Sequence, residues 1–257
     1  MRGRVFARTL AIRLSILLFL VSVSPAAAQS YTAVDLGTLD PGATRVIRGI
    51  NAAGYVVGAS TTFGTGHHGF LWRPDALVDL GALARSDWSI ARGINELGTV
   101  VGSANTGSGV RAFIWSGGTA RELGTLAGDS GSEAFGINRQ GEIVGSSSGP
   151  KGIRAVLWKS DGSIQSLGVL RSGDHAQALA VNDPGQVVGT SGQSGRQRAF
   201  LWTAAGGLRD LGALPGDVES EALGINNVGQ AIGSSGPVTR PRAVVSRARA
   251  STLEDAP

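Results

Sequence analysis

Aspartate residues recur in the loops between similar segments of this chain, and carboxylates there could bind a cation or a polar ligand. If the segments close into a ring, these side chains gather on one face. Gly-Asp and Asp-Ser pairs also favour bends by themselves, and no Asp-x-Asp-x-Asp-Gly calcium loop occurs. We therefore favour a turn-forming role and predict no metal site. Four aspartates are nearly equivalent, and the fifth lies two residues early: Asp87, Asp129, Asp174, Asp217 and Asp40.

Two further residues interrupt the repeated pattern beside these aspartates. Trp88 lies in a variable loop, away from the positions where the other tryptophans recur, and His175 directly follows Asp174. Loops carried on a rigid scaffold are common places for binding residues. We predict a non-catalytic ligand-binding set on one rim: Trp88, Asp129, Asp174, His175 and Asp217.

The chain carries no recognisable catalytic motif, so we predict no catalytic residue and no cofactor. Three scattered histidines without cysteine do not form a zinc pattern. No Gly-x-Ser-x-Gly elbow is present, and the glycine-rich stretches lack the lysine of a phosphate-binding loop. Two carboxylates that converge across a fold are invisible in a linear sequence. A carbohydrate-active enzyme or lectin therefore stays open as an alternative.

These residues depend on a scaffold that repeats about every 44 residues. A Gly-Ile-Asn tripeptide, once Ala-Val-Asn, ends at Asn51, Asn95, Asn138, Asn182 and Asn226. Self-similarity at this period is typical of β-propeller blades and solenoid repeats. The remaining tryptophans keep strict register in the third strand of each repeat, which favours a core role between sheets. They are Trp72, Trp115, Trp158 and Trp202.

Each repeat contains four short runs with the composition of β-strands. They end in Gly-Ile-Asn, Val-Val-Gly, Phe-Leu-Trp and Asp-Leu-Gly or close variants, separated by Gly, Ser, Asn and Pro. Forty glycines disfavour long helices, and no apolar period of 3.6 residues persists after the leader. The sequence predicts an all-β fold.

The turn after the first strand reads Asn-x-x-Gly. Asn can bond to the turn backbone, and Gly supplies the residue with positive φ. Asn182-Asp183-Pro184-Gly185 departs from this pattern, because Pro is disfavoured at the third position of a type I turn. We expect a different turn or a local distortion there.

The strand count suggests how the assembly closes. Ala33 to Gly37 resembles a fourth strand without a preceding repeat, and the last repeat has no fourth strand after Ser246. Pairing the two removes exposed sheet edges. We predict a five-bladed β-propeller over residues 29–246, closed by pairing the N-terminal strand with the last blade. An open β-solenoid or a differently closed ring is the alternative.

The repeated motifs resemble those of the extracellular HAF repeat family, named for a His-Ala-Phe tripeptide. The resemblance covers residues 32–246 and implies export and a repeat-built β structure, without catalytic residues. The tripeptide itself varies here, and the last repeat also has Ser246 in place of tryptophan. The aligned triplets are His68-Gly69-Phe70, Arg111-Ala112-Phe113, Arg154-Ala155-Val156, Arg198-Ala199-Phe200 and Arg242-Ala243-Val244.

Residues 1–28 have the pattern of a secretory signal peptide: four arginines, an apolar stretch from Ser15 to Val23 and Ala26-Ala27-Ala28. The apolar stretch is too short to span a bilayer. Without this segment the chain has 19 basic and 19 acidic residues, which argues against nucleic acid as a partner. Residues 247–257 are interpreted as a mobile tail.

The chain has no cysteine, so its fold depends on its core and strand ladders. We expect an exported protein, extracellular, at the cell surface or periplasmic, in a bacterial setting and without a membrane span after cleavage. Its predicted role is a non-catalytic binding scaffold for an extracellular glycan or protein. A purely structural surface protein is a further alternative.

Overall fold

Short strands joined by glycine-containing turns form all the regular structure in the computed structural model. It describes residues 32–62, 66–81, 88–170, 175–193, 196–237 and 239–246. The predicted signal peptide (1–28) and tail (247–257) lie outside these ranges. The described residues contain strands and no helix, so none of their segments is a helix that could cross a membrane. The prediction of an all-β fold is confirmed.

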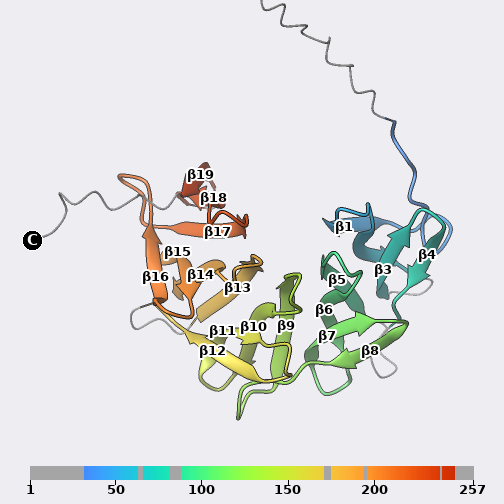
Figure 1. Cartoon of the computed structure of the whole chain (residues 1–257), viewed down its shortest axis with the longest axis horizontal. Coiled ribbons are helices and arrows are strands. Elements are labelled where there is room, and N and C mark those ends of the chain that lie inside the picture. Colours follow the sequence, from blue (N-terminus) through green and yellow to red (C-terminus); the bar gives the residue numbers. More distant parts are fainter. Residues whose placement is uncertain are drawn as a thin grey trace, which may run out of the picture. The chain divides into compact units, whose positions relative to one another are not determined.

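The strands group into five units in chain order, which we call blades 1 to 5 (Figure 1). Blade 1 contains β1 (Arg45–Ile50), β2 (Val56–Thr61), β3 (His67–Arg73) and β4 (Ala76–Asp79). Blade 2 contains β5 (Ser89–Ile94), β6 (Val100–Asn105), β7 (Val110–Ser116) and β8 (Thr119–Glu122). Blade 3 contains β9 (Gly131–Ile137), β10 (Ile143–Gly149), β11 (Gly152–Trp158) and β12 (Ile164–Gly168). Blade 4 contains β13 (His175–Val181), β14 (Val187–Gln193), β15 (Arg196–Thr203) and β16 (Gly207–Gly212). Blade 5 contains β17 (Ser220–Ile225), β18 (Ala231–Ser235) and β19 (Arg242–Ser246).

Within each blade, consecutive strands pair antiparallel, as hairpins with short connections require. Blades 3 and 4 are also joined by a parallel pair between Ile153 of β11 and His175 of β13, so they form one eight-stranded sheet. Because strands alternate in direction, the turns after first and third strands lie at one end of the blades. The hairpins after second strands and the loops between blades lie at the other end.

A glycine in the middle of each second strand permits a close approach of the first strand. In blade 3 the pairing register shifts beside Gly145, as in a β-bulge. A Cβ at Gly145 would stand 1.9 Å from the carbonyl oxygen of Glu133 and 2.9 Å from the Trp158 ring. Any side chain there would therefore displace the first strand. The equivalent glycines are Gly58, Gly102, Gly189 and Gly233.

The asparagine that ends each first strand closes the following turn. In blade 1 the amide of Gly54 donates to the Asn51 carbonyl at 2.9 Å, and the amide of Tyr55 donates to Asn51 Oδ1 at 2.9 Å. Gly54 has a φ of 78°, which disfavours other residues. The turn chemistry predicted from Asn-x-x-Gly is confirmed.

The prediction of a different turn at Pro184 is wrong. The Gly185 amide donates to the Asn182 carbonyl at 3.0 Å, and the Gln186 amide donates to Asn182 Oδ1 at 2.8 Å, as in the other repeats. The neighbouring blades hold this turn, because the Asp183 amide donates to Asn227 Oδ1 and the Asp183 carboxylate accepts from the backbone amide of Arg139. Tertiary contacts thus outweigh the local preference of proline.

The same asparagines link the blades through their side-chain amides. Each Nδ2 donates to the backbone carbonyl of the asparagine in the next repeat, at distances of 2.9 to 3.1 Å. The series ends at Asn226, whose Nδ2 donates to Gln230 of its own turn. Four members are buried, whereas Asn226 is exposed. We call this series the asparagine ladder: Asn51, Asn95, Asn138, Asn182 and Asn226.

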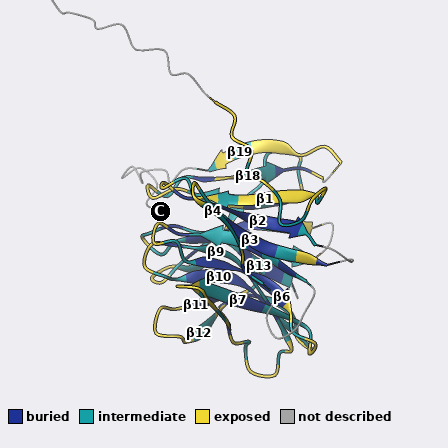
Figure 2. Cartoon of the chain, turned by 90° about the vertical axis from the view of Figure 1, so that its right-hand side faces the viewer, coloured by how far each residue is buried: buried dark blue, intermediate teal, exposed yellow. Residues whose placement is uncertain are grey.

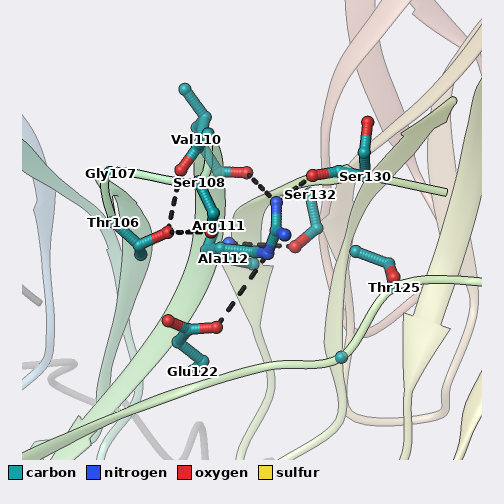
Figure 3. Close-up of polar contacts among 12 residues, drawn as sticks. Thr106, Gly107, Ser108, Val110, Arg111, Ala112, Glu122, Thr125, Ser130 and Ser132 are labelled. Carbon is teal, nitrogen blue, oxygen red and sulfur yellow. Dashed lines mark hydrogen bonds and ion pairs between the residues drawn. The ribbon is translucent and has the colours of Figure 1, made fainter. Parts of the chain in front are cut away.

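Small residues on the first strands of blades 2 to 5 allow a close contact with the preceding blade. The Ala112 amide of β7 donates to Ser132 Oγ of β9 at 3.0 Å (Figure 3), and Ser89 and Ser220 accept equivalent bonds. Two residues after the serine position stands a buried alanine in blades 2 to 5: Ala91, Ala134, Ala178 and Ala222. Blade 1 has Arg45 and Ile47 at these two positions, so its outer edge is built differently.

The hydrophobic core lies between successive blades. Around Trp158, for example, it combines Val101, Ala112 and Leu123 of blade 2 with Ala134 of blade 3. Trp158 and Trp202 are buried, whereas Trp72 and Trp115 are half-buried. All four lie in third strands, as the core interpretation requires.

The two ends of the array expose apolar side chains that are buried elsewhere. Ile232 is 56 % exposed, whereas its equivalents Val57, Val101, Val144 and Val188 are completely buried. Figure 2 shows β1 and β19 largely exposed and β2 largely buried. The cores lie between successive blades; in the described residues, blade 1 has no blade before it and blade 5 has none after it. The other exposed apolar residues of these faces are Val46, Ile47, Ile50, Leu223 and Val245.

The fourth-type strand predicted at Ala33 to Gly37 is not formed, because residues 32–38 adopt no strand. The blade 5 sheet contains β17, β18 and β19. In blades 1 to 4 a short turn joins the fourth strand to the third, which makes their pairing local. The N-terminal segment is about 200 residues from the third strand of blade 5 in sequence, so no short turn directs such a pairing.

Candidate functional site

Two of the predicted binding residues, Trp88 and His175, occupy the same position of their repeats. Trp88 forms a parallel bridge with His67 of the preceding blade, and His175 pairs in the same way with Ile153. The Trp88 carbonyl also accepts a bond from the Asn105 amide at 3.0 Å. Both side chains are half-buried. Their backbones therefore contribute to contacts between blades, which the sequence did not indicate.

Asp129 holds the loop before blade 3 against the strands that follow. Its carboxylate accepts 2.6 Å hydrogen bonds from Arg154 Nη2 of β11 and from Ser147 Oγ of β10. The Asp129 side chain is 1 % exposed. Burial opposes its ionisation, but the bonds from Arg154 and Ser147 outweigh this effect and hold its pKa below the ordinary value. The carboxylate is therefore engaged within the chain.

Asp217 forms the same arrangement in blade 5. Its Oδ2 accepts bonds from Ser235 Oγ at 2.7 Å and from Arg242 Nη2 at 2.6 Å. These two bonds lower the pKa of Asp217. The Arg242 side chain is 54 % exposed, so water screens this ion pair more than the pair in blade 3.

The other third-strand cations pair with the fourth strand of their own blade. Arg111 lies between Glu122 and the Ser130 carbonyl (Figure 3). Arg198 contacts Asp210, and His68 contacts Asp79. In blade 3 the fourth strand has Ser166 where blades 1, 2 and 4 have an acidic residue. Arg154 therefore pairs with Asp129 instead. Asp87 and Asp174 of the predicted rim lie outside the described residues.

A groove with a different composition lies between blades 2 and 3, at the opposite end from this rim. It has a volume of about 220 Å³. Its walls come from the turns after Asn95 and Asn138, from the turn between β11 and β12, and from β8. Leu123, Ile143 and Trp158 supply apolar surface. Trp158 Nε1 donates to the Gly124 carbonyl at 2.9 Å, which fixes the indole in this wall.

Three cationic side chains line the groove: Arg121 of β8, Arg139 of the blade 3 turn and Lys159 of the turn after β11. All three are exposed. Among the salt bridges of the described residues, none includes these three side chains. Asp161 lies two residues from Lys159, but its carboxylate accepts bonds from Ser163, which lower its pKa. The groove thus concentrates positive charge.

The combination of these three cations is particular to this pair of blades among the described residues. Arg139 stands where the other repeats have Ala52, Glu96, Asp183 and Asn227. Glu96 and Asp183 there accept bonds from a turn amide of the preceding blade, at Ala52 and Arg139 respectively. Arg121 stands where blade 1 has Val78 and blade 3 has Gln165, whereas blade 4 also has an arginine there, Arg209. Alignment of the repeats would have found this signal, which the sequence analysis missed.

The arrangement can bind an anion and offers no assembled metal centre. In the described part of the chain, no three His, Cys, Asp or Glu side chains lie close enough to hold a metal ion. Guanidinium groups bind carboxylate, sulfate or phosphate oxygens through two parallel hydrogen bonds. An acidic ligand group with an apolar face fits the charges and the wall of the groove.

Comparison with known proteins identifies the fold alone. No protein-family model and no curated protein matches the chain. The TolB protein of Acinetobacter baumannii, a β-propeller protein, is similar in structure with a TM-score of 0.56 and 11 % sequence identity. The match covers 79 % of this chain and 51 % of TolB, so the chain spans about half the length of that protein.

Two further solved structures are similar at lower scores. A streptogramin B lyase has a TM-score of 0.46 and 14 % identity, over 77 % of this chain and 67 % of the lyase. A gluconolactonase of Xanthomonas campestris has a TM-score of 0.44 and 19 % identity, over 74 % of this chain and 70 % of that protein. The chain has a propeller-like fold built from β-sheet blades.

Proposed function

We propose that the protein is an exported, non-catalytic binding scaffold that binds an acidic ligand in the groove between blades 2 and 3. The observation that carries this proposal is the convergence of Arg121, Arg139 and Lys159 on one groove. Rigid sheets hold the turns that supply two of these residues, so binding requires little ordering of the backbone. An extracellular glycan with carboxylate groups fits this chemistry and the expected export.

The rim predicted from Trp88, Asp129, Asp174, His175 and Asp217 is a weaker place for a ligand. Arg154 and Arg242 compete for the carboxylates of Asp129 and Asp217. A ligand there would have to replace ion pairs that already exist. We therefore place the binding function in the basic groove and keep the resemblance to HAF repeats as support for export.

Binding of an acidic oligosaccharide tests the groove. With trigalacturonate as the probe, calorimetry should detect binding that weakens as salt is added, because exposed charges are screened. Neutralising Arg121, Arg139 and Lys159 to glutamine should weaken it about tenfold, since an exposed ion pair contributes about 0.2–1 kcal/mol.

The matched control removes three charges at the other end of the blades. Lys151, Arg196 and Arg240 are exposed and lie in hairpins after second strands. Their replacement by glutamine changes the net charge equally and should leave trigalacturonate binding within about twofold of the original. Equal weakening in both triple variants would mean that net charge, and not the groove, attracts the ligand.

We further propose that the chain closes as a five-bladed propeller. Closure would cover the exposed Val46, Ile47 and Ile50 of β1 as well as Ile232 and Val245 of blade 5. The closing contact would differ from the others, because Arg45 and Ile47 replace the small residues of the other first strands.

Cross-linking tests closure. In a closed ring, Ile47 and Ala243 would face each other as Ala91 and Gly69 do between blades 1 and 2. A Cβ built on Gly69 would lie 3.5 Å from the Cβ of Ala91. This separation suits a disulfide, and the chain has no other cysteine. The variant I47C/A243C should form a disulfide within one chain. The variant A112C/A134C, at the equivalent contact between blades 2 and 3, is the positive control. A disulfide in this control but not in I47C/A243C would mean that the array of blades is open.

A further inference from the structure

A cavity of about 160 Å³ lies between blades 4 and 5, separate from the basic groove. Blade 4 and the loop after it contribute Ala199, Leu211 and Gly212 to its walls. Blade 5 contributes small residues, among them Ala231, Gly233, Val244 and Ser246, and at the edge of the cavity Glu221, Ile232 and Val245.

Aromatic rings fill the equivalent space in the other blades. In blades 1, 2 and 4 a third-strand phenylalanine pairs with the second-strand glycine, and all three rings are buried. In blades 1 and 2 the ring lies within 3.1 Å of the place where a Cβ on the glycine would stand. The residues are Phe70, Phe113 and Phe200.

Blade 3 fills the same space in a second way. It has Val156 in place of the phenylalanine, and Trp158 lies over Gly145 instead. Trp158 packs against Ala112, Leu123 and Ala134 and is 2 % exposed. A repeat can therefore exchange one ring for the other without leaving a gap.

Blade 5 has neither ring. Val244 stands at the phenylalanine position, as in blade 3, but Ser246 stands at the tryptophan position. Ala231 also replaces the larger residues Val100 and Ile143 of blades 2 and 3. The cavity walls Ala199, Leu211 and Ala222 are the equivalents of the three residues that pack against Trp158. The cavity is thus the space that an indole ring occupies in blade 3.

The cavity also retains the acceptor of the indole. Trp158 Nε1 donates to the Gly124 carbonyl at 2.9 Å, and the equivalent carbonyl in the cavity wall belongs to Gly212. Ser220 Oγ donates to the Gly212 carbonyl, and a carbonyl oxygen has a second lone pair for another donor. An entering ring with an N–H group can be bound by both apolar contact and one hydrogen bond.

We propose that this cavity is a binding site for a small aromatic molecule of the indole class. Enclosed apolar cavities of about 150 Å³ bind benzene in other proteins, so the volume suits a planar ring, and the exposed Ile232 and Val245 in the lining give a ligand access from solvent. Apolar burial supplies the main driving force, and the Gly212 carbonyl favours a ring with an N–H donor. This site does not depend on the binding of anions between blades 2 and 3.

Indole titration of the full chain tests the proposal. Saturation-transfer NMR should show indole bound, and the melting temperature should rise to a plateau with indole concentration, because a ligand of the native state stabilises it. The variant S246W recreates the Val156 and Trp158 pattern of blade 3. It should raise the melting temperature of the free protein by about 4 °C and abolish indole binding.

Two further variants make the result decisive. Val244→Phe restores the pattern of blades 1, 2 and 4 and should also block indole, so it replaces S246W if that variant does not fold. Ser116→Trp adds an indole at an exposed position of β7 and should leave binding unchanged.

The peptide Gly-Trp-Gly distinguishes a free ring from a side chain. If the protein binds indole but does not bind Gly-Trp-Gly, the result supports a site for a small molecule. Peptide bound as tightly as indole, absence of a saturable response to indole, or unchanged indole binding in both filled variants would overturn it.

Discussion

Replacing Asn138 with alanine should lower the free energy of unfolding by about 3 kcal/mol. Asn138 Nδ2 donates to the Asn182 carbonyl at 3.1 Å, and its Oδ1 accepts from the Glu142 amide at 2.9 Å. The residue is 4 % exposed, and its Nδ2 also donates to Glu142 Oε2 at 2.6 Å, so the variant removes three hydrogen bonds that contribute about 1 kcal/mol each. The melting temperature should fall by about 10 °C, as calorimetry would measure.

Asn226 provides the matched control for this variant. It closes its own turn through the Gln230 amide, but its Nδ2 reaches only Gln230 and no further blade. Asn226→Ala should therefore cost about 1 kcal/mol, the typical contribution of one hydrogen bond. If the two variants lose equal stability, the asparagine ladder contributes nothing beyond the turns.

The Asp129→Asn variant should lose about 2 kcal/mol of unfolding free energy at pH 7. The substitution keeps the shape but removes the charge that partners Arg154, which is itself only 21 % exposed. Removing one partner of a buried ion pair costs about 3–5 kcal/mol, and the partial exposure of Arg154 reduces this. Urea unfolding at pH 7 measures the difference.

The same pair predicts a pH dependence. The pKa of Asp129 is lowered in the folded state, so its stabilisation is complete above the ordinary Asp value of about 3.9. It is lost as pH falls through the lower folded value, because protonation then removes the charge. The difference between the original protein and Asp129→Asn should shrink from pH 7 to pH 3.

Asp217 serves as the comparison, because its partner Arg242 is more exposed than Arg154. Asp217→Asn should show a smaller loss at pH 7 and a smaller change with pH. An Asp129→Asn difference that stays constant between pH 7 and pH 3 would show that the charge of Asp129 does not stabilise the fold.

The sequence by itself determined the repeat, the strands and most turns of this protein. These features depend on local physical chemistry: Gly54 and its equivalents adopt positive φ, and short β-branched runs form strands. The second role of Asn138 was not visible, since its partner lies 44 residues away. Asp129 was read as a turn or rim residue for the same reason, because Arg154 lies 25 residues away.

Only the tertiary structure decided where charge and empty space collect. Arg121 and Arg139 line the same groove because blades 2 and 3 pack side by side. The cavity beside Ser246 forms because blade 4 supplies the wall opposite this small residue. The strand predicted at Ala33 to Gly37 has the composition of a fourth strand, but no short turn joins it to a third strand, as one does in blades 1 to 4. Contacts within a hairpin follow from neighbouring residues, whereas contacts between blades depend on how whole sheets pack.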